Sequence, residues 1–600
     1  MSCQVGSTHH RFWVIVGFLT AVISTYVAQA IAAPREKDKG ESHIPQVAFI
    51  DQEISNQWNE HQISPSPVST DGEWCRRVYL DVLGRIPSVD ELDAYTSSRE
   101  SEKKSKLVAT LLYDEAYTEE YARNWTTIWT NVLIGRSGGT ERNSLTDRAG
   151  MQKYLRDSFA RNKPYDRIVL ELVTARGSNR PGSEDFNGAV NFLAMKVNEE
   201  KGTLATAATA KIFMGLQVQC TQCHNHPFNE WKQQKFWEFN AFFRQSRALR
   251  QYAPGTRDVI GSELVNQDFS GEGNNVSEAE IYYELRNGLL KVAYPVFVDG
   301  TPIDRSGYVQ EVDRRTELGR LMMSSEYVDK MVVNRYWAHF MGYGFTKPID
   351  DMGPHNSPTH PALIDYLGQE IRKNSYNLKE LIRWITLSRP YGLSSKINKS
   401  NAADDPLLGE LPKFSHFYLR QMRAEELYES LMIATKAAET GGGSYEDQEK
   451  AKAQWLSQFV TAFGNDEGTE ATTFNGTIPQ ALMMFNGAMI RRATESDRGS
   501  FLADIANDQS MQPKQKIDFL FKSALARKPS TTEMVIANKL LAARMNDQGR
   551  GGNKKVDLNK AGVAALQDIW WAVLNTALSE NRLGYAAMLI RVSASWVIFG

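Results

Sequence analysis

The pentapeptide CTQCH, at residues 220–224, is the strongest restriction that this 600-residue sequence places on its own fold and chemistry. Only four cysteines occur in the chain, which excludes a disulfide scaffold and leaves the close spacing of this pair to be explained. The order C-x-x-C-H serves to attach a c-type haem, because two thiols three positions apart on one turn can reach both vinyl groups of a porphyrin. The adjacent histidine is then placed to bind the iron as proximal ligand. The motif therefore predicts a haem c held by Cys220, Cys223 and His224.

Two other interpretations of the motif stay open. Zinc is one, because Cys220, Cys223, His224 and His226 supply four ligands within a short segment, although zinc sites usually draw on two separated pairs. A disulfide between the two cysteines, structural or redox-active, is the other. A thioredoxin-like fold would need a strand before the motif, whereas the preceding LATAATAKIFMG, at 204–215, predicts a helix.

The N-terminus predicts export. Arg11 precedes an apolar run at 12–27, and Ala28-Gln29-Ala30 follows as the small-x-small pattern of a signal peptidase site. We therefore expect a signal peptide at 1–30 and a linker at 31–46, with an uncleaved membrane anchor as the alternative. Either reading places the rest of the chain in the periplasm or outside the cell, where c-type haems are attached. No later segment reaches spanning length, so no further membrane span is expected.

Length and periodicity predict a mainly α protein of two or three packed helical units. Apolar residues recur at helical spacing, for example at Leu107, Val108, Leu111 and Leu112. The segment 87–91 has a proline before a Ser-x-x-Glu capping box, which predicts the start of a helix. The same order, Arg-x-Pro-Ser-x-x-Glu, returns at 527–533, and we attribute the echo to common helix-cap chemistry rather than to a duplicated unit.

A change in composition divides the chain. Residues 251–275 are rich in Gly, Asn, Ser and Asp and predict a surface loop, and the alternating segment 292–303 predicts a short β-hairpin turned at Asp299-Gly300. The predicted organisation is an N-terminal helical domain at 47–250, a loop and hairpin insertion at 251–310, and a C-terminal helical domain at 311–585.

Charge composition excludes one class of partner. The chain has 69 basic and 71 acidic residues, for a net charge of -2. Such a balance provides no single-sign field to attract a polyanion, so nucleic-acid binding is not expected.

A second group of polar side chains occurs in PIDDMGPHNSPTHP, at 348–361. Asp350, Asp351, His355 and His360 could bind a divalent ion or line a pocket, and an extracytoplasmic enzyme could use them. The alternative is a solvated loop with helix caps, in which the two aspartates pair with Arg335.

If haem is bound, the sixth iron ligand decides its role, because methionine raises the potential, histidine lowers it and an open position permits catalysis. The candidates for that ligand are Met195, Met214, His339, His355, His360 and His416.

Several long motifs occur in a fixed order along the chain. They are CRRVYLDVLGRIPSVDEL at 75–92, VQCTQCHNHPFNEWKQQKFWEFNAFF at 218–243, VVNRYWAHFMGYGFTKPIDDMGPHNSPTHPALIDYL at 332–367, IPQALMMFNG at 478–487 and LARKPSTTEM at 525–534. Over about 50–577 the sequence resembles the planctomycete-type cytochrome-associated proteins, in which a domain of unknown function numbered 1549 (DUF1549) precedes one numbered 1553 (DUF1553).

The resemblance implies an extracytoplasmic protein whose first domain has a cytochrome-like motif, carried here by Cys220, Cys223 and His224. Members often have an additional N-terminal cytochrome c module, which this sequence lacks, so the resemblance implies an external cytochrome as redox partner. It also implies association with a secreted sulfatase-like partner. The expected function is thus an exported c-type haem protein in electron transfer. The alternatives are a non-redox scaffold or binding protein with zinc or a disulfide, and an enzyme linked to polysaccharide breakdown.

Overall fold

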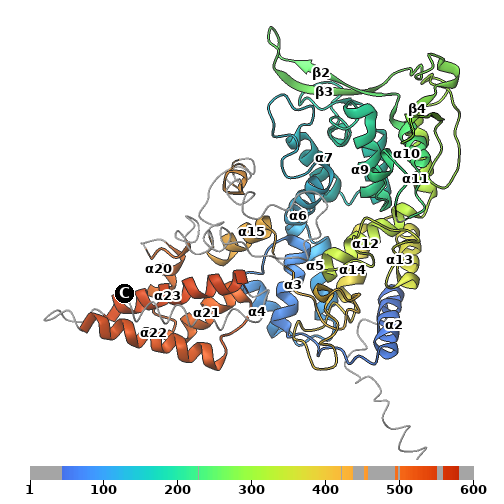
Figure 1. Ribbon diagram of the computed structural model, residues 1–600. Helices are drawn as coiled ribbons and strands as arrows, with labels where there is room; N and C mark the ends of the chain where they lie inside the picture. The colour runs from blue at the N-terminus through green and yellow to red at the C-terminus, as the bar shows by residue number, and fades with distance from the viewer. Residues whose placement is uncertain are drawn as a thin grey trace, which may run out of the picture.

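The computed structural model describes residues 43–227, 229–420, 422–436, 447, 450, 452–456, 493–496, 500–549 and 558–579 (Figure 1). The predicted signal peptide at 1–30 and most of the predicted linker at 31–46 lie outside these residues. No helix within the described ranges combines the length and the apolar character needed to cross a membrane.

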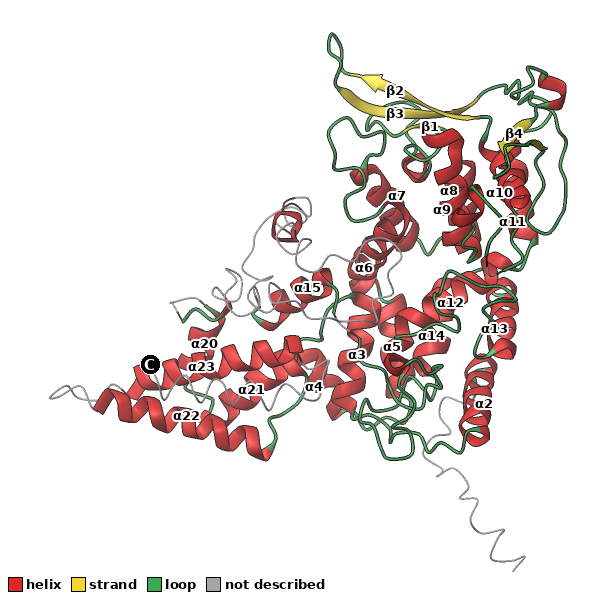
Figure 2. Ribbon diagram, viewed as in Figure 1, coloured by secondary structure: helices red, strands yellow, loops and turns green. Residues whose placement is uncertain are grey.

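The described chain is mainly α-helical, as the sequence predicted (Figure 2). The helices before the sheets are α2 (Pro45–Glu60), α3 (Asp71–Leu83), α4 (Val89–Ser97), α5 (Lys103–Tyr113), α6 (Glu115–Ile134), α7 (Arg148–Ala160), α8 (Tyr165–Thr174), α9 (Thr203–Met214) and α10 (Gln233–Asn240). Those after the sheets are α11 (Arg314–Ser324), α12 (Tyr327–Met341), α13 (Pro361–Lys373), α14 (Leu378–Leu387), α15 (Ala424–Ala434), α20 (Phe501–Asn507), α21 (Pro513–Leu525), α22 (Thr531–Gly549) and α23 (Leu558–Ser579).

Two small antiparallel sheets come mostly from the chain between α10 and α11, and β1 alone comes earlier, between α8 and α9. The strands are β1 (Gly177–Ser178), β2 (Ser246–Tyr252), β3 (Val259–Asn266), β4 (Ile281–Glu284) and β5 (Leu290–Ala293). The first sheet has the order β1-β3-β2, and the second pairs β4 with β5. Figure 2 shows the first sheet at one end of the molecule, beyond α7, α8 and α9.

The sequence placed the strands only in part. The predicted loop at 251–275 holds β3 and the end of β2, whereas at the predicted hairpin, 292–303, an isolated antiparallel bridge joins Val296 and Pro302, and the Phe297 N–H donates to the Thr301 carbonyl at 2.8 Å. The turn at Gly300 is present, with its N–H donating to the Phe297 carbonyl at 2.9 Å. The prediction of a loop at 251–275 was wrong because β2 and β3 leave apolar side chains such as Leu249 and Ile260 exposed, so a period-two apolar pattern is weak there.

The hydrophobic interior forms two cores. The first gathers side chains between Ile44 and Tyr418, together with Ala526, so α11–α14 share it with the N-terminal helices. In this core Trp125 of α6 stacks on Tyr336 of α12, with ring centroids 4.6 Å apart and planes 6° apart. The second core is built from α15 and α20–α23, with Ile86. The boundary between the two cores therefore falls after Tyr418 in the described chain, apart from Ile86 and Ala526.

Both predicted capped helix starts are confirmed. At α4, Ser88 and Glu91 form a reciprocal capping box, and the Arg85 guanidinium binds Glu91 through two hydrogen bonds of 2.8 and 2.9 Å. At α22, Ser530 and Glu533 exchange the same pair of hydrogen bonds, and Arg527 binds Glu533 at 2.9 and 3.0 Å. Each cap satisfies N–H groups at the helix start that have no intrahelical partner.

A buried ionic network joins the two cores. Arg420 lies between Asp81 of α3 and Glu426 of α15, and binds Glu426 through two hydrogen bonds of 3.1 Å. Arg423 donates to Glu426 at 2.8 Å and to Asn124 of α6 at 2.9 Å. Burial opposes ionisation of Glu426, but the two guanidiniums outweigh it and hold the pKa of this carboxyl well below its usual range.

Glu426→Gln tests this network. Neutralising one member of a buried ion pair typically lowers the free energy of unfolding by about 3–5 kcal/mol, because the charge of its partner is left uncompensated. We expect a loss of this size in the free energy of unfolding at neutral pH, measured by urea denaturation. The matched control is Asp157→Asn, which breaks an exposed pair with Lys153 and should cost less than about 1 kcal/mol.

The pH dependence has a definite sign. Because the pKa of Glu426 is lower in the folded chain, its contribution is complete above its ordinary value of 4.5 and is lost as pH falls below it. The gap in unfolding free energy between wild type and Glu426→Gln should shrink by about 1.4 kcal/mol per pH unit there. A gap that is constant down to about pH 3 would contradict the ionised network.

Candidate functional site

The C-x-x-C-H motif lies on a short turn that follows α9. The helix ends at Met214, and a 3-10 turn, η4 (Gln219–Gln222), carries the first cysteine. Cys220 and Cys223 are both free and exposed. The Gln222 carbonyl accepts hydrogen bonds from the Gln233 amide and the Trp237 indole of α10, each at 3.1 Å. Two hydrogen bonds from α10 therefore hold the turn in place, and both of its thiols are exposed.

The two histidines of the motif segment are held in opposite tautomers. His224 Nδ1 lies 2.7 Å from the Asn225 carbonyl oxygen, and because a carbonyl can only accept, Nδ1 carries the hydrogen and Nε2 the lone pair. His226 Nδ1 instead accepts from the Asn229 backbone N–H at 3.2 Å, so the hydrogen of its neutral ring lies on Nε2. His224 thus has a lone pair suited to a metal, whereas the lone pair of His226 is already used.

A loop from the second half of the chain packs against this segment. The Met352 N–H donates to the Gly215 carbonyl at 2.7 Å, and the Gln217 amide donates to Asp350 Oδ1 at 2.7 Å. Gly215 has φ +67°, and a Cβ there would collide with Cε of Met352 and lie 3.0 Å from Sδ of Met331. Glycine is therefore required at this position both for its backbone conformation and for the close approach of the loop.

The structure brings the C-x-x-C-H segment close to some, but not all, of the polar residues predicted as a second site at 350–360. The His355 ring lies beside the His226 ring, with centroids 6.3 Å apart, and His355 Nε2 is 2.9 Å from Asp351 Oδ1. Buried Asp350 lies 3.7 Å from Lys211, which takes the place of the expected partner Arg335. His360 lies apart in the core against Phe345 and Phe414, and burial lowers its pKa to about 4.

Among the candidates for a sixth iron ligand, only His355 lies on the loop that contacts the motif segment. Met214 is buried in the first core, and Met195 Sδ accepts from the Leu145 N–H at 3.3 Å. His339 is buried, with Nε2 3.0 Å from the Asp81 carbonyl, and burial together with Arg420 and Arg423 lowers its pKa to about 3. His416 is buried with Nδ1 3.9 Å from Asp404.

Metal ligands are not gathered at this site. Over the described residues, no group of three or more His, Cys, Asp or Glu side chains is arranged to hold a metal ion. The alternative zinc set of Cys220, Cys223, His224 and His226 is therefore not assembled, and neither is a divalent-ion site in the 350–360 loop.

Sequence reasoning missed the residues that join the two segments. Gln217 bonds to a carboxylate 133 positions away, and nothing in its own neighbourhood predicts such a partner. Gly215 carried a usable signal, because a glycine directly after an apolar helix predicts a left-handed C-cap. That signal does not reveal which segment packs against it.

Comparison with known families assigns the motif segment and the loop that packs against it to two different domains. A family model described as a protein of unknown function, DUF1549, matches residues 49–248, and a second one, DUF1553, matches 314–541. The chain belongs to the family of proteins with paired DUF1549 and DUF1553 domains. No curated protein and no solved structure matches it. In this DUF1549–DUF1553 protein the first domain supplies the C-x-x-C-H turn, and the second supplies the 350–356 loop that packs against it.

The three cysteines beyond the predicted signal peptide should differ sharply in reactivity. Cys220 and Cys223 are exposed, whereas burial, with Glu91 and Asp71 nearby, raises the pKa of the Cys75 thiol well above its usual range. We expect a haem-free, reduced chain that starts at residue 31 to take up two maleimide labels when folded and a third only after unfolding. Intact mass measures the count, and labelling of Cys75 in the folded chain would contradict the packing of α3.

Proposed function

We propose that this DUF1549–DUF1553 protein is an exported c-type haem protein that transfers electrons, with Cys220 and Cys223 as attachment points and His224 as proximal ligand. The observation that carries the proposal is the tautomer of His224, whose Nδ1–H donates to the Asn225 carbonyl at 2.7 Å. This hydrogen bond leaves Nε2 with its lone pair and fixes the ring, as is usual for histidines that ligate a metal.

The two thiols fit the same proposal. Both are unbridged and exposed on one turn, so they would be available to hold a haem through its two vinyl groups. Each thioether would form by addition, with the thiol hydrogen kept on the vinyl carbon, so no atom would be lost. When bound, a c-type haem supplies an iron centre that takes up and releases one electron.

His355 of the second domain is part of the proposal, as a residue that would hold the iron together with His224. It lies on the loop that packs against the motif segment, beside His226. Its Nε2–H donates to Asp351 at 2.9 Å, which leaves the lone pair on Nδ1, and a carboxylate partner of this kind orients a ligating histidine and raises its basicity. We further propose that an external redox protein exchanges electrons with the site.

The first test is covalent attachment. Because both additions retain every atom, the exported protein made with a c-haem maturation system should be heavier than the haem-free chain by about 616 Da. It should show sharp α and β absorption bands on reduction. Cys220→Ser combined with Cys223→Ser should abolish both signals, and Cys75→Ser, at a cysteine outside the motif, should retain the haem.

Two outcomes would contradict the haem proposal. A colourless protein that is lighter by two protons would indicate a disulfide between the two cysteines. A colourless protein with one zinc per chain would indicate the metal alternative.

The second test addresses His355 alone. Because methionine ligation raises the potential of haem iron relative to histidine, His355→Met should raise the midpoint potential and change the visible spectrum without loss of the attached mass. Exposed His61→Met is the control and should leave the potential unchanged. Identical potentials in wild type and His355→Met would remove His355 from the proposal and leave the attachment site standing.

A further inference from the structure

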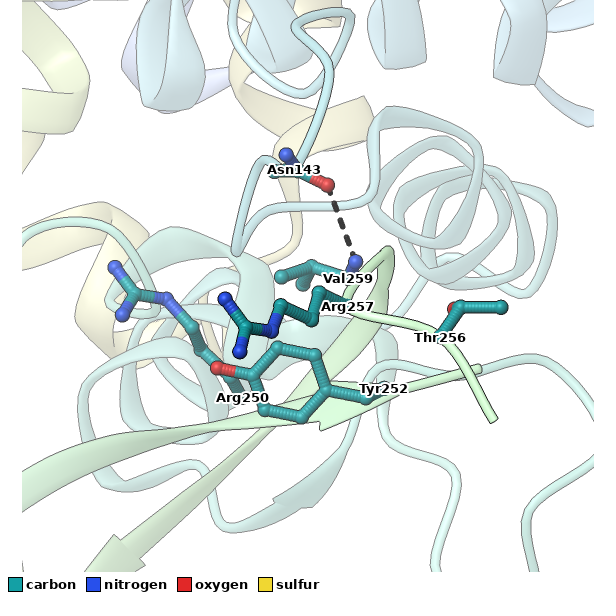
Figure 3. Close-up of a pocket in the computed structure, with 6 residues that line it drawn as sticks. All are labelled: Asn143, Arg250, Tyr252, Thr256, Arg257 and Val259. Carbon is teal, nitrogen blue, oxygen red and sulfur yellow. Dashed lines mark hydrogen bonds between the residues drawn. The ribbon is translucent and has the colours of Figure 1, made fainter. Parts of the chain in front are cut away.

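A cavity of about 550 Å³, open to solvent because every lining residue except Val259 is exposed, lies at the end of the first sheet, where the β2–β3 hairpin meets the connection between α6 and α7. Its lining residues are Asn143, Arg250, Tyr252, Thr256, Arg257 and Val259 (Figure 3). The volume falls within the range of about 300–1,000 Å³ that is usual for small-molecule sites. It greatly exceeds the share of about 30 Å³ that one water occupies in the liquid.

The lining is cationic and has no carboxylate. Neither the Arg250 nor the Arg257 guanidinium has an ion-pair partner among the described residues. The nearest acid in sequence, Asp258, is paired with Arg142 at 3.1 Å and does not neutralise the lining. Two positive charges are therefore left at one cavity without an internal counter-ion.

Strand geometry explains why the charges gather on one side. Arg250 and Tyr252 are two positions apart on β2, so they share a face of the sheet, whereas Leu249 and its partner Glu263 lie on the other face. Figure 3 shows both guanidiniums and the hydroxyl of Tyr252 on one side of the cavity, with Thr256 opposite. The only carboxylate of β3, on Glu263, is thus on the opposite face of the sheet from Arg250.

The remaining wall offers hydrogen-bond donors and an aromatic surface. Asn143 Oδ1 accepts from the Val259 backbone N–H at 3.1 Å, which fixes the side chain and leaves its NH₂ group as a donor. The Tyr252 side chain is 51% exposed, so its ring can stack on a ligand. Guanidinium groups bind carboxylate, sulfate and phosphate through paired N–H donors.

We propose that this cavity binds a small organic oxyanion, in which a carboxylate, sulfate or phosphate group is attached to a ring. Arg250 and Arg257 bind the oxyanion, Asn143 donates a further hydrogen bond, and Tyr252 stacks on the ring. A bare inorganic anion would leave most of the cavity and the exposed ring of Tyr252 unused. The site contains no residue of the C-x-x-C-H turn, so it does not depend on the proposed haem.

The test is isothermal titration calorimetry of the full exported protein with benzoate, phenyl sulfate and phenyl phosphate. Inorganic phosphate and benzyl alcohol serve as probes that lack the ring or the charge. We expect at least one of the three ring-bearing anions to bind at one site per chain, at least tenfold more tightly than inorganic phosphate, with no binding of benzyl alcohol. The probe that binds most tightly identifies the oxyanion.

Variants decide whether binding occurs in this cavity. Arg250→Gln and Arg257→Gln should each weaken binding at least tenfold, and Tyr252→Ala should reduce the advantage of the ring-bearing probe over inorganic phosphate. All three side chains are exposed, so the unfolding midpoint should not change. Arg320→Gln, at an exposed arginine of α11 that is paired with Glu317, is the matched control and should bind as wild type does.

Three results would overturn the proposal. One is the absence of binding by all three ring-bearing anions at millimolar concentration. Another is binding that both arginine variants leave unchanged, and the last is equal affinity for phenyl phosphate and inorganic phosphate. None of these results bears on haem attachment, which the mass measurement tests separately.

Discussion

The contact between α9 of the first domain and α12 of the second is the constraint on which the rest of this structure depends. The two helices pack within one hydrophobic core, and each ends at a glycine in the left-handed region, Gly215 with φ +67° and Gly342 with φ +86°. The chain leaves α9 toward the C-x-x-C-H turn and leaves α12 toward the 350–356 loop. Because Gly215 has no side chain, Met352 can approach its carbonyl to 2.7 Å, so the two segments meet. A site that spans both domains follows from this packing, since neither segment contains all of it.

The second core is attached to the first through two similar helix–turn–helix units. The unit α3–Gly84–α4 and the unit α21–Ala526–α22 each consist of a helix, one residue in the left-handed region and an Arg-x-Pro-Ser-x-x-Glu cap. The two units also contact one another, because Lys522 binds Asp93 at 2.6 Å and Arg76 donates to the Ala524 carbonyl. A Cβ at Gly72 would collide with the Ala526 carbonyl oxygen. The sequence echo thus marks two similar elements that pack together, and local cap chemistry is sufficient to explain its residues.

Sequence alone predicted the features that depend on neighbouring residues. The caps at Ser88 and Ser530, the helix before the motif and the exposed C-x-x-C-H turn all depend on contacts within a few positions. The β2–β3 hairpin was missed because exposed apolar side chains such as Leu249 and Ile260 weaken the apolar alternation of its strands. The junction between the domains was not predictable, since the Gln217–Asp350 hydrogen bond joins residues 133 positions apart. The same holds for the cavity at Arg250, where a loop between two helices closes over a distant hairpin.

The two histidines of the motif segment show how backbone geometry assigns different chemistry to identical side chains. A carbonyl faces Nδ1 of His224 and an N–H faces Nδ1 of His226, so the neutral rings carry their lone pairs on opposite nitrogens. Only one of these lone pairs is left for a ligand, which is why a four-ligand set built from both histidines is disfavoured even though the sequence spacing permits it. The Asn229 backbone N–H therefore also decides which histidine can act as a ligand. By occupying His226, it restricts metal chemistry at this turn to the histidine that follows the second cysteine.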